Sequence, residues 1–199
     1  WSEAANLAEQ VMARQCKAEP SWFGFDALGQ FQAGTISDPS GGSPVATLRA
    51  SQILEIERSA PPGLDVPVWR VQTRGRRNWM FGRTLAGAAA DYMRREWYSG
   101  AVAEDASVQT VHALAGDMSI ESSRYAPSGA ANFLALHKLD RDFLRVRVPM
   151  SASMLSTIDL ADCVELVYPR FGMHAGKKFM AVGIDAQWGA RTVTYSLWG

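Results

Sequence analysis

Four carboxylates stand in pairs that could support acid–base chemistry. Paired carboxylates hydrolyse glycosides when both face one cleft. Glu104 and Asp105 are adjacent, so on a strand they would point to opposite faces. Glu55 and Glu57 would share a face, but charged side chains in such a pattern are usually solvated. The sequence also has no G-x-S-x-G turn, P-loop or G-x-G-x-x-G segment, and it predicts a protein that is not an enzyme.

The histidines and cysteines are the residues that could bind a metal, but their spacing does not favour a site. His112, His137 and His174 lie in unrelated contexts, and none has a second His, Asp or Glu at the i+4 spacing of a helical metal site. Cys16 and Cys163 are far apart, without the short spacing of a zinc knuckle or a redox pair. We therefore expect no metal, no cofactor and two reduced thiols.

A basic run with an aromatic residue could bind nucleic acid. In RGRRNW, Arg74, Arg76 and Arg77 surround Gly75 and are followed by Trp79, so phosphates could be held while the indole stacks on a base. The alternative is a solvated strand end whose Trp79 returns to the core. Twenty basic and twenty acidic side chains give a formal net charge of zero, which favours this alternative. Contact with passing DNA is expected to be non-specific only.

The residues best suited to a contact with another chain form the segment YPRFG near the C-terminus. Pro169 fixes φ and cannot donate to a ladder, so the strand that reaches Tyr168 must end or bend there. Arg170 stands between aromatic neighbours, with Phe171 and Gly172 following, and could pair with a carboxylate or stack on a ring. The alternative is an ordinary β-connection whose aromatics pack internally. Tyr168 to Gly172 are thus candidate interface residues.

Composition limits the elements that can position these residues. The chain has 199 residues, 47% hydrophobic and 20% charged, as expected of one or two globular domains. No apolar stretch approaches the roughly 20 residues of a membrane-spanning helix, so we expect no membrane partner. The first residue is Trp1 rather than Met, which suggests a piece of a longer polypeptide. Helical spacing of apolar residues predicts three short helices, near 2–16, 85–98 and 129–139.

Strand patterns occupy most of the remaining chain. FGFDALGQFQAGTI predicts a hairpin that turns near 26–29, and SDPSGGSP at 37–44 predicts an exposed, mobile connection. VPVWRVQTRGRRNWMF predicts a strand with one wet face. FLRVRVPM, DCVELVYP, KKFMAVGIDAQ and TVTYSLW predict an antiparallel sheet. The fold class is therefore α+β, mainly β, with antiparallel sheets or small β-barrel-like domains, divided into a mixed region 1–140 and a C-terminal β domain 141–199.

The C-terminal segment LADCVELVYPRFGMHAGKKFMAVGIDAQWGARTVTYSLWG resembles a signature of tail-tip proteins from tailed bacteriophages and prophages. Members tend to read Leu-Gly-Asp-Val-Val, then Tyr-Pro-Arg-Phe-Gly-Leu, then an apolar strand with Val-Gly-Ile, and end near Leu-Trp-Gly. WFGFDALGQFQAG and VPVWRVQTRGRRNW also resemble segments of this family. Two positions depart from its pattern: Ala161 stands where Gly is usual, and Cys163 replaces a Val.

The resemblance implies a baseplate or tail-tip hub protein of the virion, assembled in the bacterial cytoplasm. Such hubs are homotrimers whose β-barrel domains form a ring that joins the tail tube protein to central fibre or spike proteins, contacts other tail-tip proteins and admits the genome during ejection. The alternative is a carbohydrate-binding or cell-wall-acting module of the tail tip, with Trp22, Trp69, Trp79 and Trp97 as a sugar platform. A trimer would favour the hub, and a monomer that binds peptidoglycan would favour the module.

Overall fold

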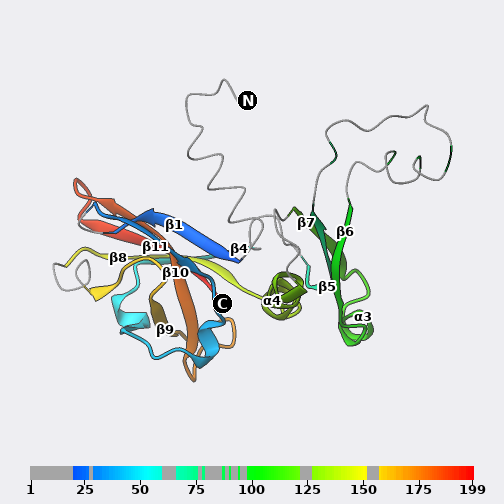
Figure 1. The fold of residues 1–199 in the computed structure, drawn as a ribbon. Helices are drawn as coiled ribbons and strands as arrows, with labels where there is room; N and C mark the ends of the chain where they lie inside the picture. The colour runs from blue at the N-terminus through cyan, green and yellow to red at the C-terminus, as the bar shows by residue number, and fades with distance from the viewer. Residues whose placement is uncertain are drawn as a thin grey trace. The chain divides into compact units, whose positions relative to one another are not determined.

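The computed structural model describes residues 20–26, 29–59, 66–75, 78, 87, 90, 94, 98–121, 127–151 and 157–199. The chain divides into two units (Figure 1). Unit 1 comprises Trp1–Ser21 and Val66–Leu139, and unit 2 comprises Trp22–Asp65 and Asp140–Gly199. Each unit is described by itself. In the described part of the chain, no helix is long and apolar enough to cross a membrane.

Unit 2 is built on a six-stranded sheet. In spatial order its strands are β3 (Ala46–Arg49), β9 (Cys163–Val167), β10 (Lys177–Gln187), β11 (Thr192–Trp198), β8 (Phe143–Pro149) and β4 (Glu55–Ser59). All neighbours are antiparallel except β3 and β9, which are parallel. The four C-terminal strands, predicted from runs rich in β-branched and aromatic residues, are confirmed as β8 to β11, and the mainly β fold class is confirmed with them.

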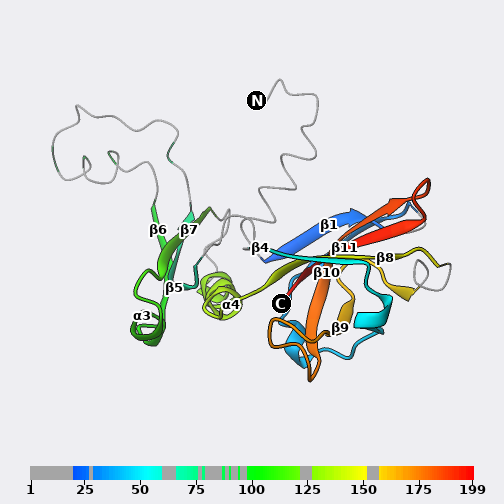
Figure 2. The ribbon, with the colours of Figure 1, turned by 180° about the vertical axis from the view of Figure 1, so that it is seen from behind.

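The sheet curls into a half-barrel (Figures 1 and 2). Laid flat, six strands would put the outer two, β3 and β4, about 24 Å apart. Those two strands are consecutive in the chain and are joined only by residues 50–54, of which the first three form the 3-10 helix η2 (Ala50–Gln52). A connection of this kind spans about 16 Å. The short connection therefore requires the edges of the sheet to approach each other.

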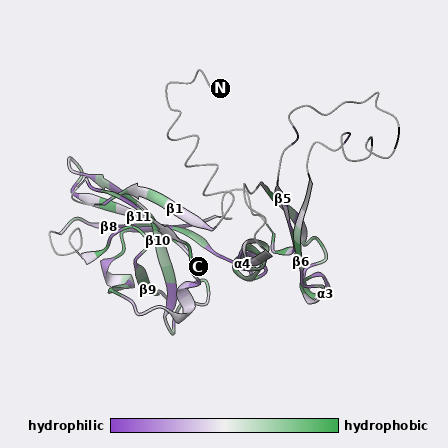
Figure 3. Ribbon diagram, in the orientation of Figure 1, coloured by the Kyte–Doolittle hydropathy of each residue, from purple (hydrophilic) through white to green (hydrophobic). Residues whose placement is uncertain are grey.

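The inside of the curled sheet is the core of unit 2. Along β8 and β11, buried apolar side chains alternate with less buried ones. Figure 3 shows that the strands of this sheet carry both hydrophobic and hydrophilic residues. Three cross-strand pairs face the interior: Leu144 with Leu197, Val146 with Tyr195, and Val148 with Val193. All six side chains are fully buried, and burial raises the pKa of the Tyr195 hydroxyl. β-Branched and aromatic side chains suit such a half-buried sheet, which is why the runs rich in them located these strands.

The predicted hairpin near the start of the described chain is confirmed. β1 (Ser21–Phe25) and β2 (Phe31–Thr35) form a two-stranded sheet of their own. The Asp26 amide donates to the Gln30 carbonyl at 2.9 Å, and Gly29 takes a φ of 74° in the turn. Glycine adopts this left-handed conformation without the steric cost that a side chain brings, so the turn falls where the sequence places it.

The Ser- and Gly-rich connection at 37–44 is not a strand, as expected, but it is not loose or fully exposed. It contains the 3-10 helix η1 (Pro39–Gly41), and Pro39 is buried. The Asp38 carboxylate caps η1 by accepting from a backbone amide at 2.9 Å. The Lys178 ammonium donates to the Gly42 carbonyl at 2.8 Å. The composition of the segment could not reveal these contacts, because their partners lie far along the chain.

Unit 1 contains a three-stranded sheet and two described helices. The central strand β5 (Val68–Gly75) pairs antiparallel with β6 (Tyr98–Glu104) and parallel with β7 (Gly116–Glu121). Helix α4 (Pro127–His137) contacts β5 and β6, and α3 (Ser107–Val111) contacts β5. The apolar side of α4 is buried through Ala130, Phe133, Leu134 and Leu136.

The three predicted helices have different outcomes. The helix predicted near 129–139 is confirmed as α4. The segment 2–16 lies outside the described residues, as does most of 85–98, whose last residue Tyr98 begins β6. Helix α3 was not predicted, because five residues are too few to display helical periodicity. Its local signal is Asp105, whose carboxylate accepts from the backbone amide of Ser107 at 3.2 Å.

The two units divide the chain differently from the predicted regions 1–140 and 141–199. Residues 22–65, placed in the first region, pack with 140–199 because β3 and β4 supply the two edges of the half-barrel. Ser59 at the end of β4 lies opposite Phe143 at the start of β8. Residues 66–139 therefore leave and return between two paired strands, as an insertion into unit 2.

Candidate functional site

The YPRFG segment lies in the connection between β9 and β10. Strand β9 ends at Val167, two residues before Pro169, as the prediction required. The backbone of Tyr168 donates to the carbonyl of Met173 at 3.1 Å, and the Met173 side chain is fully buried. The connection is therefore held at its base by a hydrogen bond and an apolar anchor.

The tip of this connection is a tight turn. The Met173 amide donates to the Arg170 carbonyl at 3.2 Å, and the two residues between them, Phe171 and Gly172, have φ values of 58° and 74°. Positive φ at both central positions is the pattern of a type I′ turn. Gly172 meets this need without cost, whereas Phe171 is held there against its preference. The turn directs Arg170 and Phe171 to the surface, where both are exposed.

Phe171 nevertheless contacts its own chain. The Arg58 guanidinium lies 5.7 Å from the centre of the Phe171 ring, which remains 42% exposed. Arg58 Nε is 2.5 Å from the carboxylate of Asp142, which also accepts from Lys177 Nζ at 2.7 Å. Asp142 is only 8% exposed, so its charge is compensated by these two cations. Phe171 thus combines the internal packing and the exposed position that the sequence left as alternatives.

A groove of about 440 Å³ adjoins the same connection. Arg49 at the end of β3 and Val167 at the end of β9 are partners in the parallel register. Their neighbours Leu48 and Leu166 are fully buried, so Arg49 and Val167 point to the outside of the half-barrel. The groove is lined by Arg49, Ser51, Val167, Tyr168, Pro169 and His174.

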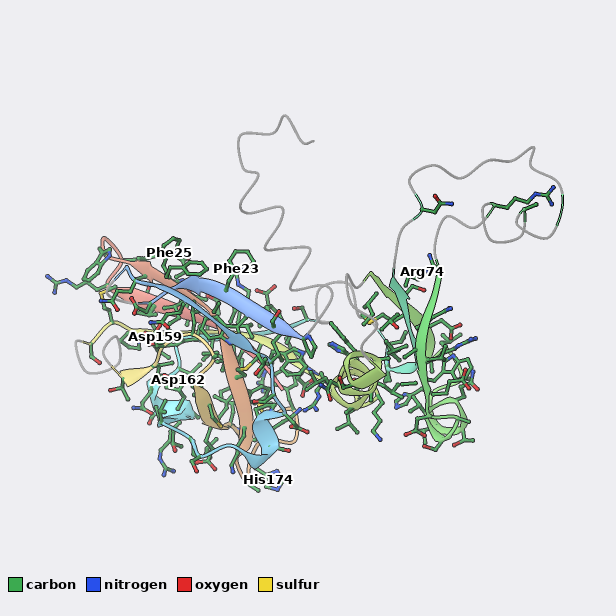
Figure 4. The ribbon with its side chains drawn as sticks, in the orientation of Figure 1. Phe23, Phe25, Arg74, Asp159, Asp162 and His174 are labelled. Carbon is green, nitrogen blue, oxygen red and sulfur yellow. The ribbon has the colours of Figure 1, made fainter. Side chains whose placement is uncertain are left out.

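Three basic side chains line or adjoin the groove. Arg49, Arg170 and His174 are all exposed, and within the described residues none of them forms an ion pair. Figure 4 shows His174 at the surface of unit 2. By contrast, Arg141 lies beside Asp38, with its Nη2 3.0 Å from the carboxylate. The groove therefore carries positive charge that no carboxylate of the described chain neutralises.

Two of the five predicted interface residues line the groove. Tyr168 and Pro169 form part of its wall, whereas Arg170 is exposed in the adjoining turn. Arg49, which also lines the groove, was not predicted as a neighbour of this segment. Strand β3 is too short to show a clear alternation, so no local pattern could have pointed to Arg49.

The first pair of candidate catalytic carboxylates belongs to the outer face of the half-barrel. Glu55 lies opposite Arg147 in the register of β4 and β8, and their charged atoms are 3.5 Å apart. Glu57 lies opposite Arg145. Opposite charges across an antiparallel pair stabilise the register of a sheet. This arrangement explains the two carboxylates without a cleft between them.

The second pair lies at the end of β6 in unit 1. Glu104 is 3.1 Å from Arg70, on the neighbouring strand β5. The Asp105 carboxylate accepts from the Ser107 hydroxyl and lies 3.1 Å from Lys138 Nζ. The pKa of Asp105 is lowered, first by the hydrogen bond from Ser107 and then by Lys138. Both carboxylates are therefore occupied by contacts within unit 1. The lowered pKa of Asp105 keeps it ionised, whereas a general acid needs a raised pKa.

The remaining sequence candidates are only partly described. Arg74 of the basic run is exposed on β5 (Figure 4), but Arg76, Arg77 and Trp79 lie outside the described residues. Trp97 also lies outside them, and Trp22 and Trp69 are half-buried. Within the described ranges, no group of three metal-binding side chains gathers.

Three phenylalanines of the predicted hairpin form an aromatic cluster, in which Phe25 and Phe31 are exposed. The ring of Phe31 lies 5.8 Å from that of Phe25 and 6.5 Å from that of Phe23. Phe25 is 68% exposed and Phe31 50%. The opposite face of the hairpin carries Gly24, where a Cβ would lie only 2.5 Å from the side chain of Leu160. The hairpin therefore packs on the rest of unit 2 through its glycine face and leaves Phe23 and Phe25 outward (Figure 4).

Comparison with known proteins found similarity at the level of structure. No protein-family model matches the chain, and no curated protein matches it. A tail protein from Neisseria meningitidis MC58 superposes with a TM-score of 0.57 over 99% of this chain and 55% of its own, at 13% identity. The 43 kDa tail protein of prophage MuSo2 from Shewanella oneidensis gives a TM-score of 0.50 over 95% of this chain and 50% of its own, at 11% identity.

A third solved structure, prophage tail protein gp18 from Listeria monocytogenes EGD-e, gives a TM-score of 0.47 at 10% identity, over 94% of this chain and 51% of its own. The first two similarities extend over nearly the whole chain, so the chain has the fold of part of these phage-type tail proteins. It spans about half of their length.

Proposed function

We propose that this chain is a structural component of a bacteriophage or prophage tail, and more specifically part of a hub or baseplate ring at the tail tip. The observation that carries the proposal is the superposition of 99% of the chain on a tail protein. The curled sheet of unit 2 supports it, because barrel-like domains with exposed connections can make symmetric contacts. The candidate carboxylates held in ion pairs support a non-enzymatic role.

The proposed hub is a homotrimer that joins the tail tube protein to central fibre or spike proteins and other tail-tip proteins. In this arrangement the ring lies on the tail axis and admits the genome during ejection, touching DNA only non-specifically. The connection from Tyr168 to Gly172 is the proposed contact with a neighbouring chain, because its turn presents Arg170 to solvent without an internal ion pair among the described residues.

Mass measurement and imaging test this proposal. Sedimentation of the full chain, alone and mixed with tail tube and fibre proteins, should give a species about three times the 21.7 kDa mass of one chain, or a larger joint complex. Electron microscopy of tails that carry a labelled copy should place the label on the tail axis. A chain that stays monomeric in every mixture and is absent from purified tails would refute the proposal.

The alternative function is a carbohydrate-binding or cell-wall-acting module of the tail tip. One observation favours it: the exposed cluster of Phe23, Phe25 and Phe31 presents ring faces on which a sugar could stack. The same preparation distinguishes the two functions. A monomer that sediments with peptidoglycan, and no longer does so after Phe25→Ser, would support the module over the hub.

A further inference from the structure

We propose that the groove beside the Tyr168 connection binds the carboxylates of an acidic segment of another protein. The inference rests on the proposed function for the kind of partner, a neighbouring tail protein, and adds the chemistry by which that partner is recognised. It depends on two features of the groove, its unpaired positive charge and its apolar wall.

The positive charge of the groove is available to a partner. Arg49 lines the groove and Arg170 adjoins it, and neither has an ion-pair partner among the described residues. Elsewhere in unit 2, Arg58 and Arg141 are paired with carboxylates of the same chain. Carboxylates are therefore the complement that this surface lacks, and a guanidinium binds them with paired hydrogen bonds.

The wall of the groove favours a peptide segment over a free ion. Val167, Tyr168 and Pro169 follow one another along one side, and Pro169 has a fixed φ. The hydrogen bond between Tyr168 and Met173 holds this wall in place before any partner arrives. A preorganised wall lowers the entropic cost of binding. We therefore infer a segment that places apolar side chains on this wall and carboxylates beside Arg49.

The charge pattern favours an acidic protein segment over nucleic acid. Non-specific binding of nucleic acid is built from several phosphate contacts, each made by a cation. The two lysines that begin β10 are already engaged: Lys177 pairs with Asp142, and Lys178 donates to the carbonyls of Ser40 and Gly42. With a formal net charge of zero, the chain offers no wider positive field to compensate for the small number of cations at the groove.

The test is a titration of the full chain with a peptide probe. Binding is monitored by the amide chemical shifts of the chain in NMR and by calorimetry. The probe is a short peptide of alternating Glu and Leu with blocked ends, and its matched control has Gln in place of Glu. We expect amide shifts confined to residues 49–51, 167, 168, 170 and 174, since Pro169 has no amide proton, and weaker binding as salt is raised. Arg49→Gln should weaken binding roughly threefold to tenfold, in the range of an exposed to partly buried charge contact. Arg191→Gln, an exposed cation in the turn between β10 and β11, should leave binding unchanged.

Three results would overturn the inference: equal binding of the Gln peptide, shifts located outside the groove, or binding of an oligothymidylate in place of the peptide. An Arg49→Gln chain that binds as tightly as the unchanged chain would also overturn it. The titration needs no tail, so its outcome is separate from the proposed function. Failure to bind in a chain that enters tails would refute the inference alone, and peptide binding by a chain absent from tails would refute the proposed function alone.

Discussion

Replacement of Ala161 by glycine should stabilise unit 2. Ala161 has a φ of 66°, and it is the third residue of a turn in which the Asp162 amide donates to the Asp159 carbonyl at 3.2 Å. Figure 4 marks both aspartates at this turn. A turn with positive φ at its third residue is of type II, which favours glycine there. The Ala161 amide also donates to the carbonyl of Ala181 on β10 at 2.7 Å, so the backbone cannot relax without losing that bond.

The size of the effect follows from two opposing terms. An L-residue in the left-handed region costs about 1–2 kcal/mol, and Ala161→Gly removes that cost. Glycine loses more conformational freedom on folding than alanine, which lowers the stability of the folded chain by about 0.5–1 kcal/mol. The net gain is about 0.5–1 kcal/mol, or a rise in Tm of roughly 1–4 °C for a chain of this length.

Urea denaturation followed by tryptophan fluorescence measures this change, because Trp198 is buried in unit 2. The midpoint should rise while the slope m stays constant, since the surface exposed on unfolding does not change. The matched control is Ala186→Gly in β10, where φ is not positive and glycine should cost about 0.5–1 kcal/mol. If Ala161→Gly lowered the midpoint as much as Ala186→Gly, the left-handed conformation would not be the source of strain.

Three further changes test the loop, an ion pair and the core. Arg170→Ala should leave the Tm of the isolated chain nearly unchanged but reduce its incorporation into tails, because an exposed charge contributes little to a monomer; unfolding of this variant would refute the interface. Arg141 and the cap bond lower the pKa of Asp38, so its stabilisation is present above about pH 4, the unfolded value, and is lost as the pH falls. The Tm difference between the unchanged chain and Asp38→Asn should therefore shrink from pH 6 to pH 2, and a constant difference would contradict this linkage. Phe179→Ala in the core should lower the free energy of unfolding by about 3–5 kcal/mol, whereas Phe171→Ala at the surface should lower it by at most about 1 kcal/mol; equal losses in urea titrations would contradict the burial of Phe179.

The sequence by itself determined the elements whose causes are local. Runs rich in β-branched and aromatic residues located β8, β9, β10 and β11, because such side chains pack well on a half-buried sheet. Pro169 ended β9 and Gly172 allowed the return, because each acts through its own backbone. At position 161 the resembled family usually has glycine. The positive φ of Ala161 is the conformation that favours glycine there.

Only the tertiary structure decided which distant segments meet. Arg49 and Val167 are neighbours across β3 and β9 but lie 118 residues apart in the chain, so no local pattern could bring them to one groove. The curl of the sheet likewise depends on β3 and β4, whose four and five residues are too few to display a clear alternation. The exposure of Phe25 and Phe31 depends on which hairpin face packs on unit 2, and the contact of Gly24 with Leu160 decides it. Local residues therefore specify the strands and turns, whereas long-range pairing specifies the charged groove and the aromatic surface.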